Sequence, residues 1–168
     1  MKFNQIQHFF KIDKTNYLGF YSFNIFKADE TDINLIEILK HSLLSAKFDK
    51  GLNDLIKRNV DEFGPLDSNK LMESDFQKTN FNGLKEAVEK YWEDEDWGVD
   101  LPVFKTNFKE VEVILQELNL IEGEFYFINL ETIRPALIPY PNFWTYFFSF
   151  VCIENKSQTV MTTYFGLD

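Results

Sequence analysis

One short acidic segment holds the residues whose types and spacing are best suited to chemistry. It consists of four consecutive carboxylates: Glu93, Asp94, Glu95 and Asp96. Three aromatic residues and one further acid flank this acidic run: Tyr91, Trp92, Trp97 and Asp100. Trp and Tyr are enriched at protein interfaces, and charged rims speed the encounter of two partners. We therefore expect these eight residues to form a partner-binding surface, with Trp92 or Trp97 as its desolvated anchor; the alternative is a solvated acidic loop.

The spacing of these acids does not fit a dedicated metal site. A calcium loop of the EF-hand type needs glycine at its sixth position, whereas counting from Asp94 puts Gly98 fifth and Val99 sixth. Structural zinc needs Cys and His at short spacing, and the chain has one Cys and two His far apart. The seven glycines are isolated, so no phosphate-binding loop is expected. We predict no metal and no cofactor.

The two histidines allow a catalytic alternative. His41 stands four residues after Glu37 on the polar side of an expected helix, where a weak surface ion pair is the ordinary interpretation. The alternative is a general base that Glu37 orients. His8 lies in an expected strand beside two Phe residues, which favours a position at a sheet edge or partly in the core. No pairing of a nucleophile with a base is visible.

Cys152 and Arg134 have structural interpretations. Cys152 stands among aromatic residues of an expected central strand, which predicts an inert core thiol because reactive thiols need accessible, electropositive surroundings. Arg134, one of only two arginines, is expected to pair with Glu131 or another acid. Recognition of a carboxylate or an aromatic ring is the functional alternative.

The elements that must position these residues follow from hydrophobic periodicity. Helices are expected at 32–48, 51–59, 84–94 and 108–118, the last capped by Thr106 or Asn107 and separated from the preceding helix by Pro102. Strands are expected at 3–12, 17–27, 124–130, 143–153 and 158–165. We expect turns at 13–16 and 155–156 and a loop at 61–69, and residues 70–82 are left without an assignment.

This order predicts an α+β fold: a single domain, 1–168, with one mainly antiparallel sheet. The N-terminal hairpin (1–27) and the C-terminal strands (124–165) would build the sheet, and the mostly helical segment 31–119 would pack on it. Both sides of strand 143–153 are largely apolar, which indicates a central strand covered on both faces. In strand 17–27 one side becomes polar in its middle, which is typical of a half-buried strand.

Charge restricts the class of partner. The chain has a net charge of −10, and residues 1–27 carry +3 while the remainder carries −13. A protein with this much negative charge is not expected to bind nucleic acid or anionic lipid directly. It is expected to bind a basic protein partner. A single Cys fits a reducing cytoplasm, no signal peptide is visible, and the longest apolar stretch, at 11 residues, is too short to span a membrane. We expect a cytoplasmic location; the sequence does not indicate an oligomeric state.

The first functional hypothesis is an acidic protein-binding protein that occupies the basic site of its partner. This profile, a small acidic α+β domain with no catalytic motif, is similar in general to that of bacterial immunity proteins, which neutralise a toxic nuclease or similar effector. A toxin domain is therefore the expected kind of partner. The second hypothesis is a module that encloses an apolar small molecule against Trp144, Tyr146, Phe148 and Phe150. The third is a hydrolase that uses carboxylates with His41 or His8.

Overall fold

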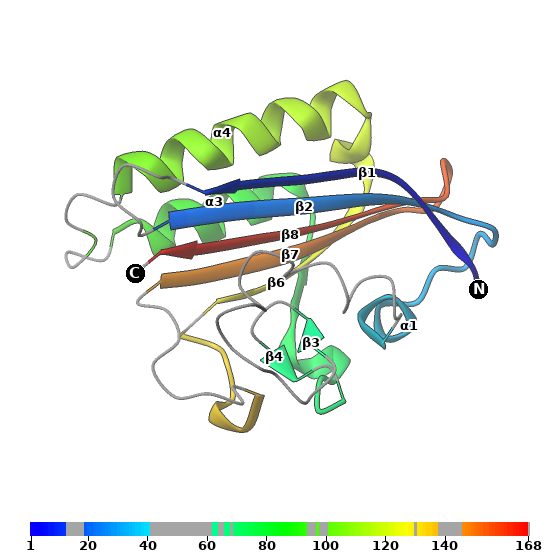
Figure 1. Cartoon of the computed structure of the whole chain (residues 1–168), viewed down its shortest axis with the longest axis horizontal. Helices are drawn as coiled ribbons and strands as arrows, with labels where there is room; N and C mark the ends of the chain where they lie inside the picture. Colours follow the sequence, from blue (N-terminus) through cyan, green and yellow to red (C-terminus); the bar gives the residue numbers. More distant parts are fainter. Residues whose placement is uncertain are drawn as a thin grey trace.

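A six-stranded antiparallel sheet organises the chain (Figure 1). The computed structural model describes residues 1–12, 19–40, 62–63, 66–67, 69–93, 97, 101–129, 131–137 and 146–167. The strands of the sheet are β1 (Phe3–Ile12), β2 (Gly19–Ala28), β5 (Gln77–Thr79), β6 (Glu124–Asn129), β7 (Tyr146–Glu154) and β8 (Thr159–Leu167). Their spatial order is β1-β2-β8-β7-β6-β5. The N-terminal hairpin thus joins the C-terminal strands through the β2–β8 pair, and the predicted α+β class is confirmed.

Two amphipathic helices cover one face of the sheet, which we call the helix face: α3 (Phe81–Tyr91) and α4 (Leu101–Glu117) (Figure 1). Asn80 caps α3, because its side-chain oxygen accepts a hydrogen bond of 3.0 Å from the Gly83 amide. α4 begins at Leu101, so the expected cap at Thr106 or Asn107 is wrong: both residues lie inside the helix, and Pro102 stands in its first turn. Proline is tolerated in the first turn of a helix, where its missing N–H has no partner to lose.

Shorter elements cover the opposite face, which we call the second face (Figure 1). These are α1 (Leu35–Lys40), the hairpin of β3 (Glu62–Phe63) with β4 (Leu66–Asp67), and the 3₁₀ turns η1 (Glu73–Asp75) and η4 (Pro135–Leu137). A further 3₁₀ turn, η3 (Leu120–Glu122), connects α4 to β6. Residues 61–69 were expected to form a loop, and they include the short β3–β4 pair. The unassigned segment 70–82 contains η1, β5 and the start of α3.

Burial on both faces confirms one expectation and overturns another. All nine residues of β7 are buried, as predicted for a central strand. β2 is also covered on both faces: Ser22 and Asn24, expected on an open side, have no solvent exposure. The half-buried interpretation was wrong because segments far away in the sequence cover the second face.

Several sequence expectations fall outside the described residues. They include the turn at 13–16, the helix at 51–59, and the expected helix after Lys40, with His41. The turn at 155–156 is confirmed, and Gln158 closes it with a positive φ of 54°. No helix in the described parts of the chain is long and apolar enough to cross a membrane.

Candidate functional site

Tyr91 and Trp97, the aromatic residues on either side of the acidic run, pack together in the core. Trp97 is only 2% exposed, and its indole N–H donates a hydrogen bond of 2.8 Å to the backbone carbonyl of Tyr91. The two rings meet edge to face at 5.2 Å. The two aromatic residues that flank the acidic run in the sequence are therefore held against each other in the core.

Both residues are fixed to β7. Trp97 stacks on Tyr146, with ring centroids 3.8 Å apart and ring planes 10° apart. The Tyr91 hydroxyl donates to the carbonyl oxygen of Phe147 at 3.2 Å and accepts from its amide at 3.3 Å. Sequence reasoning placed Tyr91 and Trp97 on a binding surface. In the structure both side chains are buried, and they flank the acidic run in the sequence.

Trp92 and Glu93 are the described residues of the predicted surface that reach solvent. Trp92 is half-buried between the two long helices, with its ring edge to face against Phe104 at 6.3 Å and Phe108 at 5.9 Å. The Lys105 ammonium lies 5.1 Å from the centre of the Trp92 ring, a cation–π distance. Glu93 is exposed. The other four predicted residues lie outside the described part of the chain: Asp94, Glu95, Asp96 and Asp100.

Exposed acidic residues on one side of α3 lie next to Glu93. Glu86 and Glu89 are exposed, and with Glu93 they follow the three- and four-residue spacing that places side chains on one side of a helix. Lys85, next to these acids, is directed toward α4, where its ammonium lies 3.8 Å from the Glu112 carboxylate. Exposed Lys90 lies on the same side, so the outer side of α3 carries three acids and one base and is net negative.

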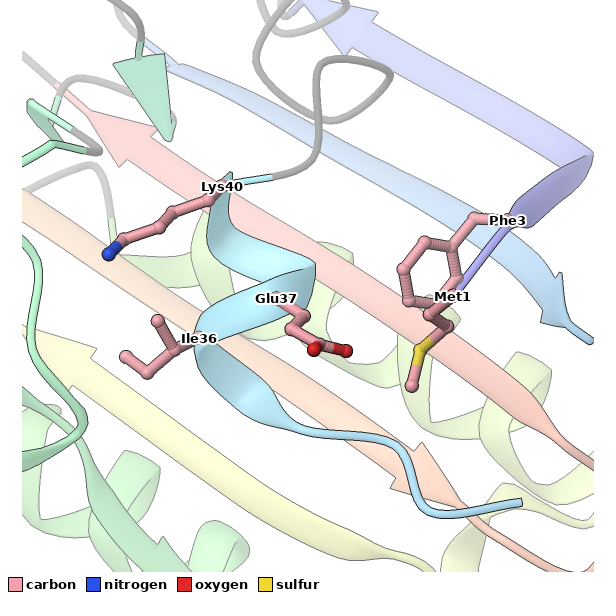
Figure 2. Close-up of a pocket in the computed structure, with 5 residues that line it drawn as sticks. All are labelled: Met1, Phe3, Ile36, Glu37 and Lys40. Atoms are coloured by element: carbon pink, nitrogen blue, oxygen red, sulfur yellow. The ribbon is translucent and has the colours of Figure 1, made fainter. Parts of the chain in front are cut away.

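A shallow pocket that the sequence did not indicate lies between the start of β1 and α1 (Figure 2). Its volume is about 290 Å³, and its lining is Met1, Phe3, Ile36, Glu37 and Lys40. Figure 2 shows Glu37 pointing from α1 toward Met1 and Phe3, with Lys40 directed away. Glu37, the residue considered as an orienting partner for a catalytic histidine, therefore lines an open pocket of mixed character.

Side chains fill the space in which an apolar ligand was considered. Phe148 stacks on Phe127 at 5.7 Å, and Phe104 of α4 meets it edge to face at 6.4 Å. Phe150 contacts Phe125 at 5.9 Å. With Tyr146 covered by Trp97, this aromatic layer is part of the core beneath the helices, which counts against a ligand cavity there. Trp144 lies outside the described residues.

For the catalytic alternative, His41 and the side chain of His8 lie outside what the structure describes. Within the described ranges, no group of three or more His, Cys, Asp and Glu side chains could hold a metal ion. His8 pairs with Asn24 in the β1–β2 register. Cys152 is fully buried, its thiol donates to the Leu120 carbonyl oxygen at 3.3 Å, and burial raises its pKa well above the ordinary value. These contacts agree with the predicted inert core thiol.

Arg134 forms the expected structural ion pair, and its partner is Asp75. The guanidinium contacts both carboxylate oxygens, from Nε to Oδ1 and from Nη2 to Oδ2 at 2.8 Å. Nη2 also donates to the Lys70 carbonyl oxygen at 3.0 Å, and the Met72 amide donates to Asp75 at 2.8 Å. The pair thus ties η4 to η1. This ion pair with Asp75 explains the presence of Arg134 without any bound ligand.

Comparisons with protein-family models, with curated proteins and with solved structures found no match to this chain.

Proposed function

We propose that this chain is an acidic cytoplasmic protein that binds a basic protein, and that the acidic run forms the centre of the contact. The observation that carries the proposal is the pair of supports at its ends, because Tyr91 and Trp97 are both packed against β7. A binding segment whose ends are held on a rigid scaffold loses less conformational entropy when its partner arrives. Such supports would be unnecessary for a merely solvated stretch of acids.

Electrostatics supports the same partner class. The exposed Glu86 and Glu89 extend the negative charge from Glu93 along α3, in a chain whose net charge is −10. Long-range attraction of this kind raises the rate of encounter with a basic surface and falls with ionic strength. Half-buried Trp92 would then supply apolar contact at the edge of the charged centre.

The kind of partner that best fits is a toxin or nuclease whose active site attracts phosphate. Consecutive carboxylates can occupy the Lys and Arg side chains that would otherwise hold the phosphates of a substrate. In this proposal the chain acts as an immunity protein or inhibitor: it neutralises the partner by covering its basic site, without chemistry of its own.

The test begins with the product of the adjacent gene as the candidate partner, in catalytically inactive form, and measures its affinity by titration calorimetry. The binding variant reverses the four acids: Glu93→Lys, Asp94→Lys, Glu95→Lys and Asp96→Lys. The control makes the same change in net charge at four exposed acids elsewhere: Glu73→Lys, Glu117→Lys, Glu122→Lys and Glu131→Lys.

The first variant should bind about 100-fold more weakly or worse, since several charge pairs in one contact become repulsive. The control should lose less than about tenfold, because remote charges act mainly through screened, long-range attraction. Circular dichroism should show that both variants remain folded. Equal losses in the two variants would mean that net charge alone, and not the acidic run, determines binding.

A further inference from the structure

The pocket between β1 and α1 combines apolar side chains with a carboxylate (Figure 2). Its apolar lining is Met1, Phe3 and Ile36, and we call these three side chains the apolar wall. Phe3 is part of the core of the second face, and Met1 and Ile36 pack against the same core. The core therefore holds the apolar wall in place, as in most small-molecule sites, which are largely formed before the ligand arrives.

The size of the pocket restricts the ligand to a small molecule. Its volume of about 290 Å³ lies at the lower end of the range for small-molecule sites, which begins near about 300 Å³. The pocket is open to solvent, so a ligand can enter it without a rearrangement of the fold. A molecule with a single ring and a short polar chain would suit this space.

Glu37 contributes the carboxylate of the pocket. Its side chain is exposed and points from α1 toward Met1 (Figure 2). Two neighbouring acids already have partners: the Lys2 amide donates to the Asp29 carboxylate at 2.7 Å, and the Met1 ammonium lies 3.2 Å from Glu30. Among the described residues, Glu37 has no such hydrogen bond or ion pair. Its charge is therefore available to a ligand.

The electrostatic surroundings favour a ligand with a positive charge. A hydrogen bond to Glu30 raises the pKa of the Met1 amino group. The charges of Glu30, Asp29 and Glu37 act in the same direction, against the effect of desolvation. Lys40 lines the pocket as well, but its side chain is directed away from Glu37 (Figure 2). A cation beside Glu37 would therefore be attracted, whereas an anion would be repelled by the same carboxylates.

We infer that this pocket binds a small organic amine, whose ammonium group pairs with Glu37 while its apolar part covers the apolar wall. Each part of such a ligand finds a complementary surface there, because an ammonium group is attracted to a carboxylate and an apolar group gains from leaving water. A metal ion fits less well, since the described residues contain no group of three or more His, Cys, Asp and Glu side chains that could hold one. This site is independent of the proposed protein contact: it lies on the second face, and the contact lies at the end of α3 on the helix face.

The test compares four probes: phenethylamine, phenethyl alcohol, phenylpropionate and ethylamine. The full chain is titrated with each of them at pH 7, where both amines are protonated, and ligand-observed NMR gives the affinities. Phenethyl alcohol should bind at least about threefold more weakly than phenethylamine, as expected for the loss of one exposed ion pair. Phenylpropionate should bind at least about tenfold more weakly, because attraction becomes repulsion, and ethylamine likewise, because it lacks the ring. No binding of phenethylamine, or equal binding of phenethylamine and any other probe, would overturn the inference.

The methyl groups of Met1 and Ile36 report where the amine binds. In a protein with isotope-labelled methionine and isoleucine methyl groups, phenethylamine should shift the signals of these two residues in proportion to its binding. The Met161 methyl group is buried in the core beneath the helices, and its signal should stay unchanged. Shifts confined to methyl groups other than those of Met1 and Ile36 would place the amine elsewhere and contradict the inference.

Two matched variants test the role of the carboxylate. Glu37→Gln keeps the size of the side chain and removes its charge, so it should weaken phenethylamine at least about threefold and leave phenethyl alcohol nearly unchanged. Glu117→Gln makes the same change in net charge at the exposed end of α4 and should keep the wild-type affinity. Both positions are exposed, so both variants should remain folded by circular dichroism. Unchanged affinity in Glu37→Gln, or equal losses in the two variants, would show that Glu37 does not hold the amine.

Discussion

Trp97 lies face to face with Tyr146, with 3.8 Å between ring centroids and 10° between ring planes. This contact joins the end of the acidic run to the first residue of β7. The same indole donates to the Tyr91 carbonyl oxygen, so one side chain fixes both ends of the segment that the proposed function uses. Trp97 faces the core, so under the proposed function its loss would reduce both stability and binding.

The first prediction concerns the different contributions of Trp92 and Trp97 to the stability of the protein. Trp97→Ala should lower the free energy of unfolding by about 3–5 kcal/mol, since it removes a large buried ring and a hydrogen bond. Trp92→Ala should cost clearly less, because Trp92 is only half-buried. Urea unfolding followed by circular dichroism measures both values. Similar losses for the two variants would be inconsistent with the different burial of the two rings.

The second prediction concerns the acid sensitivity of the Asp75–Arg134 pair. Hydrogen bonds from Arg134 lower the pKa of the Asp75 carboxyl, against the opposing effect of burial. A carboxyl whose pKa is depressed in the folded state stabilises the protein above its ordinary pKa, here 3.8, and loses this contribution as the pH falls through the folded-state value. Asp75→Asn should therefore be less stable than wild type at pH 7, and the difference should shrink below about pH 4.

Urea midpoints measured across this pH range provide the test. Glu73→Gln is the control, because Glu73 is an exposed acid of the same short turn. This control should follow the wild-type curve. A difference between Asp75→Asn and wild type that persists unchanged to pH 2 would show that ionisation of Asp75 is not its cause.

The third prediction concerns the reactivity of Cys152. Burial raises the pKa of this thiol, and the Glu154 carboxylate acts weakly in the same direction, so thiolate should be almost absent in the folded protein at pH 7–9. Iodoacetamide should label Cys152 only as fast as the protein unfolds. Mass spectrometry in increasing urea checks this: labelling should follow the unfolding transition. Rapid labelling without urea would require an accessible thiol.

Local periodicity predicted most of the strands and the long helices of this fold. The alternation of side chains located both hairpins, and the continuous apolar character of 143–153 identified β7 as a central strand. These features depend on neighbouring residues, so a single sequence contains them. The placement of Pro102 was missed because the same residue can end one helix or stand in the first turn of the next.

Features that depend on distant partners were not predictable in this way. Trp97 beside four acids was interpreted as an interface residue, and only its contact with Tyr146 shows that it belongs to the core. Arg134 was expected to find an acid, but Asp75, its partner, is 59 residues away. Likewise, Ser22 and Asn24 give strand β2 a polar side that a sequence cannot distinguish from a solvent-facing one. Burial of this side depends on which segments cover the sheet.

The most direct test of the proposed contact is zero-length carbodiimide cross-linking of the chain to its basic partner. This reagent joins carboxylates to lysines only when they touch, and mass spectrometry identifies the joined residues. The proposal predicts that cross-links from Glu93, Asp94, Glu95 or Asp96 to partner lysines dominate and disappear at high salt. Cross-links that arise only from acids elsewhere, such as Glu73 or Glu131, with none from the acidic run, would contradict it.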